Sequence, residues 1–158
     1  MSVSMQTFLA DSCKATCENL IAAVLNLPED KRLWSPAPTS RSAINLIAEC
    51  ALGNAYTAEL IETSKWPDGT LEDFIQAQTE LTNGEWETLE ALLRSNTERF
   101  CTAVRDLPDD RLNEIVELPL GRFAGKYPIS FTVSYCYWNM SYHEGQINYI
   151  ASILGELK

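Results

Sequence analysis

The sequence predicts an all-α protein, a four-helix bundle with long linkers between its helices. Apolar residues recur every three or four positions over four stretches of about 22 to 25 residues each. Proline or glycine lies close to the ends of these stretches. Each helix would be roughly 35 Å long and would carry one apolar stripe, which it buries most simply against three other helices.

The chain length and composition predict one globular domain over residues 1–158. Hydrophobic residues make up 46% of the chain and charged residues 22%, as in ordinary globular domains. The net charge is −10, and no basic cluster is dense enough to follow a phosphate backbone, which argues against nucleic-acid binding.

The sequence also indicates where the protein is located. No stretch of about 18 apolar residues predicts a membrane span, and the first twenty residues do not resemble a signal peptide. The five cysteines have no Cys-x-x-Cys spacing. We therefore expect a cytoplasmic protein with reduced, mostly buried thiols and no membrane partner.

The first two long helices are predicted over residues 5–26 and 42–64. The first ends at Pro28, because the residue before a proline avoids the helical region, and Pro28 then suits a short helical turn. The proline-rich segment 34–40 should be extended and stiff. Either Ser40 or Ser42 can cap the second helix.

The second half of the chain is predicted to add a short helix and two long ones. A capping-box signal at 70–73 opens a short helix that ends near residue 81, and a long helix follows over 85–107. The linker 113–130, which contains Gly121 among its turn residues, should hold a small β-like segment at 115–118. The last helical run covers 131–154 and ends at Gly155.

A short internal repeat accompanies the helices. Segment 27–33 and segment 107–112 share a Leu-Pro start, acidic residues and a closing leucine, and each follows a long helix. The repeat predicts two helix–linker–helix halves related by a pseudo-twofold axis.

The only histidine, His143, lies within the last helical run. At helical spacing it shares a line with Cys136, Asn139, Gln146, Ile150 and Ile153. The middle of this line is polar although its ends are apolar. Polar side chains on an inward face need partners, so we expect a hydrogen-bonded or metal-ligating cluster inside the bundle.

Two groups of residues carry a resemblance to a known family. The sequence His-Glu-Gly-Gln-Ile at 143–147 and the Trp-Ser-Pro linker at 34–36 resemble the DinB-like superfamily, and the resemblance extends over nearly the whole chain. It implies a four-helix bundle of the DinB/YfiT-like type, often a homodimer, in which three histidines hold a divalent metal. Related proteins include transferases and isomerases that use low-molecular-weight thiols, and many have no assigned activity.

Matched by position, the family's three metal ligands fall on Glu49, Asn139 and His143, so only one of them is a histidine. The resemblance implies one divalent transition metal (zinc, nickel or iron) in a degenerate site. The alternative is that Glu49 and Asn139 replace the metal with hydrogen bonds to His143. The expected surroundings of this site are Trp34, Cys50, Gly53, Cys136, Tyr142 and Gln146.

Two functions therefore remain open at this point. One is a metal- or thiol-dependent enzyme of the transferase or hydrolase kind. The other is a non-catalytic dimeric bundle that has lost the metal and binds an unknown small ligand or partner. Trp34 is expected to close the site. The aromatic residues of the last helix are expected in the core or at a dimer interface; they are Tyr135, Tyr137, Trp138, Tyr142 and Tyr149.

Overall fold

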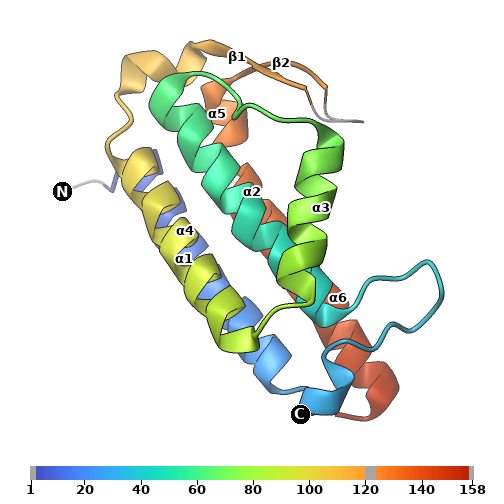
Figure 1. Cartoon of the computed structure of the whole chain (residues 1–158). Helices are drawn as coiled ribbons and strands as arrows, with labels where there is room; N and C mark the ends of the chain where they lie inside the picture. Colours follow the sequence, from blue (N-terminus) through green and yellow to red (C-terminus); the bar gives the residue numbers. More distant parts are fainter. Residues whose placement is uncertain (1–2, 120–123, 157–158) are drawn as a thin grey trace.

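Four long helices form the body of the molecule (Figure 1). The computed structural model describes residues 3–119 and 124–156. The long helices are α1 (Met5–Leu25), α2 (Ala43–Thr63), α4 (Trp86–Arg105) and α6 (Tyr135–Leu154). Helix α1 packs against α4 and α6, and α2 packs against the same two helices, so α1 and α2 lie diagonally across the bundle. The predicted all-α four-helix bundle is confirmed.

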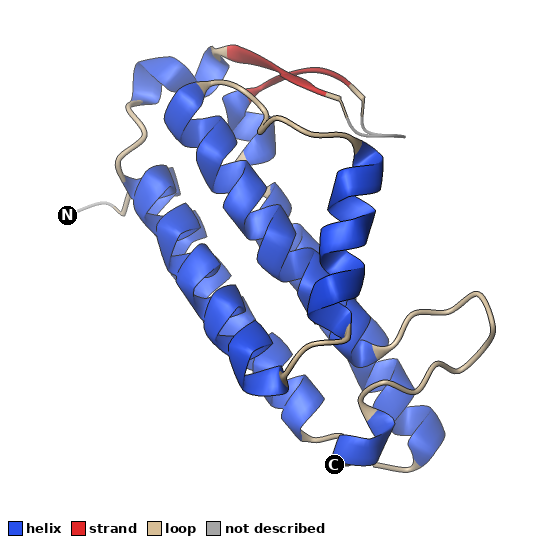
Figure 2. Cartoon of the chain, viewed as in Figure 1, coloured by secondary structure: helices blue, strands red, loops and turns tan. Residues whose placement is uncertain are grey.

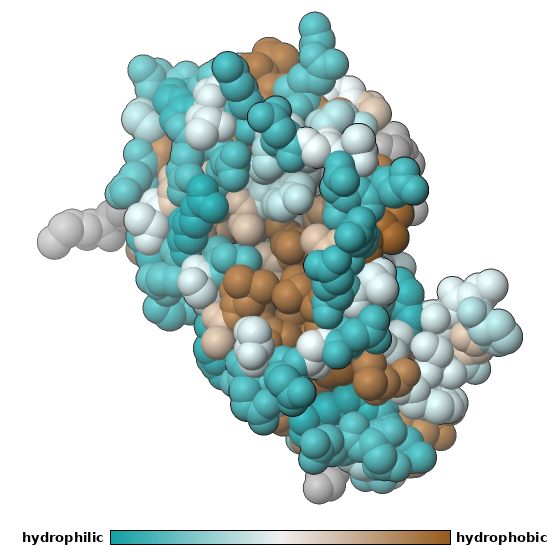
Figure 3. Space-filling model, viewed as in Figure 1, coloured by the Kyte–Doolittle hydropathy of each residue, from teal (hydrophilic) through white to brown (hydrophobic). Residues whose placement is uncertain are grey.

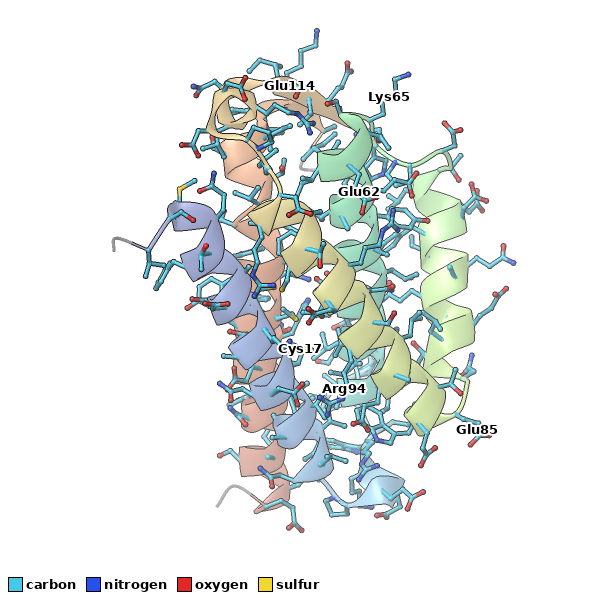
Figure 4. The ribbon with its side chains drawn as sticks, turned by 90° about the vertical axis from the view of Figure 1, so that its left-hand side faces the viewer. Cys17, Glu62, Lys65, Glu85, Arg94 and Glu114 are labelled. Atoms are coloured by element: carbon cyan, nitrogen blue, oxygen red, sulfur yellow. The ribbon has the colours of Figure 1, made fainter. Side chains whose placement is uncertain are left out.

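The helices do not simply alternate in direction. Ion pairs Lys14–Glu98 and Arg105–Asp11 join α1 to α4 in antiparallel order, and Figure 4 shows Arg94 and Cys17 at the seam between these helices. By contrast, α2 and α4 run in the same direction (Figure 1). Among the linkers between long helices, the segment 64–85 has to cross from one end of the bundle to the other, because it joins these parallel neighbours, and it contains α3.

Smaller elements occupy these linkers (Figure 2). They are the 3₁₀ helices η1 (Glu29–Lys31) and η2 (Asp109–Asn113), helix α3 (Leu71–Thr82), strands β1 (Ile115–Leu118) and β2 (Gly125–Pro128), and the short helix α5 (Ile129–Thr132). Helix α3 packs on the outside of α2, and the antiparallel hairpin β1–β2 lies at one end of the bundle.

Most predicted boundaries agree with the structure. Ser42, rather than Ser40, caps α2, since its hydroxyl accepts a hydrogen bond from the backbone N–H of Asn45 at 3.3 Å. The β segment at 115–118 is present, whereas its partner β2 was not predicted. Gly121 lies outside the described residues. The two repeat segments both contain a buried leucine, an extended proline and a 3₁₀ helix.

The last helix is shorter than predicted. The run 131–154 is interrupted at Val133 and Ser134, so α6 begins only at Tyr135. The hydroxyls of Thr132 and Ser134 donate to the backbone carbonyls of Ile129 and Phe131, at 2.8 and 3.0 Å. These bonds close the separate turn α5 and compete with a continuous helix.

The core contains the inward faces of all four long helices. The five cysteines are buried and unpaired, as expected for reduced thiols. No helix in the described part of the chain is long and apolar enough to cross a lipid bilayer. Figure 3 shows hydrophobic atoms in a band between α4 and α3, with mostly hydrophilic atoms over the outer faces.

Several residues of α6 lie differently from the prediction. Ile153 is exposed, although its spacing from His143 placed it on the inward line. Tyr137, Trp138, Tyr142 and Tyr149 are also exposed, so they do not belong to the core. Helix α6 is apolar or aromatic on nearly every face, and periodicity alone therefore does not separate its inner and outer sides. That a second copy covers these aromatics stays a prediction.

The start of α3 provides a test of helix capping. Thr70 accepts a hydrogen bond from the Asp73 backbone N–H at 3.1 Å, and the Asp73 carboxylate accepts one from the Thr70 backbone N–H at 2.7 Å. We expect Thr70→Ala to lower the free energy of unfolding by about 1 kcal/mol in urea titrations, because one helix-end donor loses its partner. The matched control is Thr79→Ala in the middle of α3, which should be close to neutral.

Candidate functional site

A carboxylate and an imidazole meet inside the bundle between α2 and α6. His143 Nε2 lies 3.2 Å from Glu49 Oε1. The His143 side chain is 4% exposed and that of Glu49 is 22% exposed. Because α2 and α6 run antiparallel and both residues lie on facing sides, the fold brings together two residues that are 94 positions apart.

The second ring nitrogen of His143 also has a partner. Its Nδ1 lies 2.6 Å from Oε1 of Gln146, one helical turn further along α6. An ionised Glu49 accepts a hydrogen bond from Nε2–H. Nδ1 then either donates to Gln146 or accepts from a reoriented Gln146 amide. In both arrangements the Nε2 proton points at Glu49, so this nitrogen offers no lone pair to another group.

Arg41 completes the cluster, and the sequence reasoning missed it. Its Nη1 bonds to the second carboxylate oxygen of Glu49, Oε2. Its Nε donates to Asn45 Oδ1 at 2.6 Å, and its Nη2 donates to the Asn45 backbone carbonyl at 3.0 Å. Positions 41, 45 and 49 are four apart, so the helical spacing at the start of α2 was the signal that could have revealed this arrangement.

Helix α3 holds this cluster from outside. The side-chain amide of Gln78 donates to both the backbone and the side-chain oxygen of Asn45, each at 3.1 Å. Asn45 Nδ2 in turn donates to Thr82 Oγ1 at 3.1 Å. These bonds restrict Asn45, which positions Arg41 against Glu49.

The electrostatics of Glu49 follow from its neighbours. Burial opposes ionisation, but the hydrogen bond with His143 and the positive charge of Arg41 outweigh it and lower the pKa of Glu49 to about 2. Glu49 is therefore a carboxylate at neutral pH, with both oxygens engaged.

The other predicted residues do not join this cluster. Asn139 donates from Nδ2 to the Cys50 sulfur at 3.7 Å. Burial raises the pKa of the Cys50 and Cys136 thiols, which keeps both protonated. Gly53 faces the ring of Tyr135, and a Cβ at Gly53 would lie 3.7 Å from that ring. Gly53 thus accommodates an aromatic neighbour.

A cavity of about 730 Å³ borders the cluster. We call it the linker-end cavity, because the segment 36–41 forms one wall and the second half of α6 forms the other. Among the predicted surroundings, Tyr142 and Gln146 line it, together with Arg41. Trp34 packs against the core and is not among the described residues that line the cavity, and its closing of the site stays a prediction.

This donor set does not fit a transition metal held by the three predicted positions. Glu49 uses both oxygens for protein partners, the His143 Nε2 proton faces Glu49, and the Asn139 amide faces a thiol. Among residues 3–119 and 124–156, no group of three or more His, Cys, Asp or Glu side chains is arranged to hold an ion. The guanidinium of Arg41 supplies the positive charge beside the carboxylate.

Comparison with protein families identifies one match. The family model described as the DinB superfamily matches residues 13–147. No curated protein matches the sequence.

Several solved structures share the fold of this chain. The chain is similar to YfiT from Bacillus subtilis, described as a probable metal-dependent hydrolase with an unusual four-helix bundle topology. The two structures have a TM-score of 0.80 and 12% sequence identity, and the comparison covers 98% of this chain and 91% of YfiT. It is also similar to a DinB-like protein from Bacillus subtilis, with a TM-score of 0.66 and 16% identity. That comparison covers 93% of this chain and 92% of the other.

A third similar structure is larger. It is a mycothiol-dependent maleylpyruvate isomerase, with a TM-score of 0.72 and 13% identity, and the comparison covers 93% of this chain but 63% of the isomerase. At these identities the structures show a shared fold.

The depressed pKa of Glu49 makes a prediction about acid stability. The carboxylate has a pKa of about 2 when folded, against an ordinary value of 4.5. The contribution of this carboxylate to the free energy of unfolding is therefore fully present above pH 4.5 and is lost as the pH falls towards 2. At neutral pH we expect the free energy of unfolding of wild type to be about 2 to 3 kcal/mol higher than that of Glu49→Gln. Between pH 4.5 and pH 2 the two values should converge.

The matched control is Glu62→Gln, also on α2. Its side chain pairs with Arg99 at the surface at 2.5 Å. Exposed pairs contribute roughly 0 to 1 kcal/mol, so this variant should stay close to wild type at every pH. The free energies of unfolding are measured by urea titration. A difference between wild type and Glu49→Gln that does not change with pH would contradict the depressed pKa of Glu49.

Proposed function

The chain belongs to the DinB superfamily, and from that membership we propose that it is a metal-independent member that binds a small molecule in the linker-end cavity. The network of Arg41, Glu49, His143 and Gln146 forms the polar floor of this binding site. No chemical step is assigned to it, since the His143 ring is nearly fully covered.

The observation that carries the proposal is the position of Arg41. A buried carboxylate needs a compensating positive charge, and a metal ion or a basic side chain can provide it. Here a guanidinium binds Glu49 directly and is itself held by Asn45. A metal ion would have to displace this cation and the His143 proton together.

The cavity has features of a ligand site. Its volume of about 730 Å³ falls within the usual range for small-molecule pockets. Arg41 is the single charged side chain among its described lining residues, and Tyr142 and Tyr149 offer exposed aromatic surface. Three of the five guanidinium N–H groups are engaged. The remaining two favour a ligand with an acceptor oxygen and a flat apolar body.

The second candidate is a metal- or thiol-dependent enzyme. Its support is the contact between Glu49 and His143, which are both competent metal ligands, in a fold shared with a probable metal-dependent hydrolase and a mycothiol-dependent isomerase. Metal content separates the two candidates.

We expect protein purified without a histidine tag to contain less than about 0.1 equivalent of any transition metal, before and after incubation with zinc or nickel and desalting. The measurement is elemental analysis by inductively coupled plasma mass spectrometry. Stoichiometric uptake in wild type that is lost in a folded His143→Gln variant would favour the enzyme.

Gly145 allows the cavity to be blocked without touching the charge network. It lines the cavity, and a Cβ at this position meets no atom within 4 Å. We expect sodium benzoate to bind wild type with a dissociation constant of about 1 mM, measured by shifts of the Arg41 and Gln146 side-chain N–H signals in NMR spectra. Gly145→Trp should abolish these shifts.

The control is Gly145→Ala. It should keep benzoate binding and raise the free energy of unfolding by about 0.5 to 1 kcal/mol, because alanine is the better helix former. Equal benzoate shifts in wild type and Gly145→Trp would show that the ligand does not occupy this cavity.

A further inference from the structure

A second cavity lies at the opposite end of the bundle from the linker-end cavity. We call it the hairpin-end cavity, because Leu118 of β1 and the neighbouring helix α5 contribute to its wall. Its volume is about 520 Å³. Leu60 and Trp66 contribute from α2 and the loop after it, and Trp138 contributes from α6. Figure 1 shows the hairpin and α5 at the upper end, far from the linker that borders the first site.

The two cavities are separate sites. On α2 the linker-end cavity uses Leu46 and the hairpin-end cavity uses Leu60. These residues are 14 positions apart, which corresponds to about 21 Å along a helix. The described lining residues of one cavity do not occur in the other. The second cavity is thus lined by its own set of residues, and Trp138 of this set stacks on Tyr142 of the first cavity.

The hairpin-end cavity extends from the surface into the core. Phe131 and Trp138 form its rim and are 50% and 47% exposed, whereas Leu60 at its floor is 0% exposed. The rim rings are held in place by stacking. Phe131 stacks on Tyr127 with ring centroids 4.7 Å apart, and Trp138 stacks on Tyr142 at 5.6 Å. Rings restrained in this way lose little freedom when a ligand binds.

The wall is uncharged among the described residues, and its three aliphatic hydroxyls already donate hydrogen bonds. The hydroxyls of Thr57, Thr132 and Ser134 donate to backbone carbonyls at 2.7, 2.8 and 3.0 Å. The protons of these three hydroxyls are used, so these groups offer acceptor lone pairs to a ligand. A charged ligand would lose its hydration there without compensation, whereas an uncharged ligand would not.

We propose that the hairpin-end cavity binds an uncharged aromatic compound of two or three rings. Its aromatic rim suits such a compound through stacking, and the remaining lone pairs accept a single hydrogen bond from an N–H or O–H group. The volume lies within the range of small-molecule pockets. A helix of a partner protein is the alternative occupant. Such a helix is about 10 Å in diameter and needs a long open groove, which a cavity of this size does not provide.

The test uses N-phenyl-1-naphthylamine, a neutral aromatic amine whose fluorescence rises in apolar surroundings. With the full chain we expect saturable enhancement at one probe per chain and a dissociation constant of about 1 to 10 μM. Trp138→Ala and Phe131→Ala should each raise that constant at least about tenfold. Both residues are half exposed, so the variants should keep the wild-type circular dichroism spectrum.

The matched control is Tyr149→Ala, an exposed aromatic of the same helix that lines the other cavity. It should bind the probe as wild type does, and 10 mM sodium benzoate should not displace the probe. Non-saturable enhancement, or equal affinity in wild type and Trp138→Ala, would overturn the proposal. So would a stable wild-type dimer that excludes the probe and becomes monomeric in Trp138→Ala, since a second copy would then occupy this face.

Discussion

The ionic hydrogen bond between Glu49 and His143 is the interaction on which the interior arrangement depends. A carboxylate removed from water is costly unless it is paired, and here Arg41 and His143 each bind one of its oxygens. This pairing joins α2 to α6, and through Arg41 and Asn45 it also joins the linker and α3 to the bundle. Four separate segments are thus coupled through one charged group.

The fold could be predicted from helical periodicity, whereas the pairing of Glu49 with His143 was implied by the resemblance to the DinB-like superfamily. Glu49 and His143 lie on the facing sides of two antiparallel helices, so the bundle brings them together. Arg41 was missed because it precedes the helix, and its direction depends on where Ser42 starts α2. Asn139 lies one turn from His143, but its amide faces Cys50, a rotation that spacing does not reveal.

Other features escaped prediction for different physical reasons. Strand β2 contains glycine, lysine and proline, which do not favour strands, and it forms only because β1 is there to pair with it. The break before Tyr135 has neither proline nor glycine and results from hydroxyl groups that bond to the backbone. The exposed aromatics of α6 belong to a helix that is apolar on most faces, so its sequence carries little information about its orientation.

The parallel arrangement of α2 and α4 has a consequence for how the chain folds. Helices that follow each other as antiparallel hairpins can dock pairwise, but here α1 and α2 lie diagonally and α2 pairs with α4 only after the chain has returned through α3. Native contacts therefore join residues that are distant in sequence, and contact order is higher than in a bundle of successive hairpins. Assembly of this core requires both halves of the polypeptide, so folding is expected to be slower and more cooperative than in a simple up-and-down bundle.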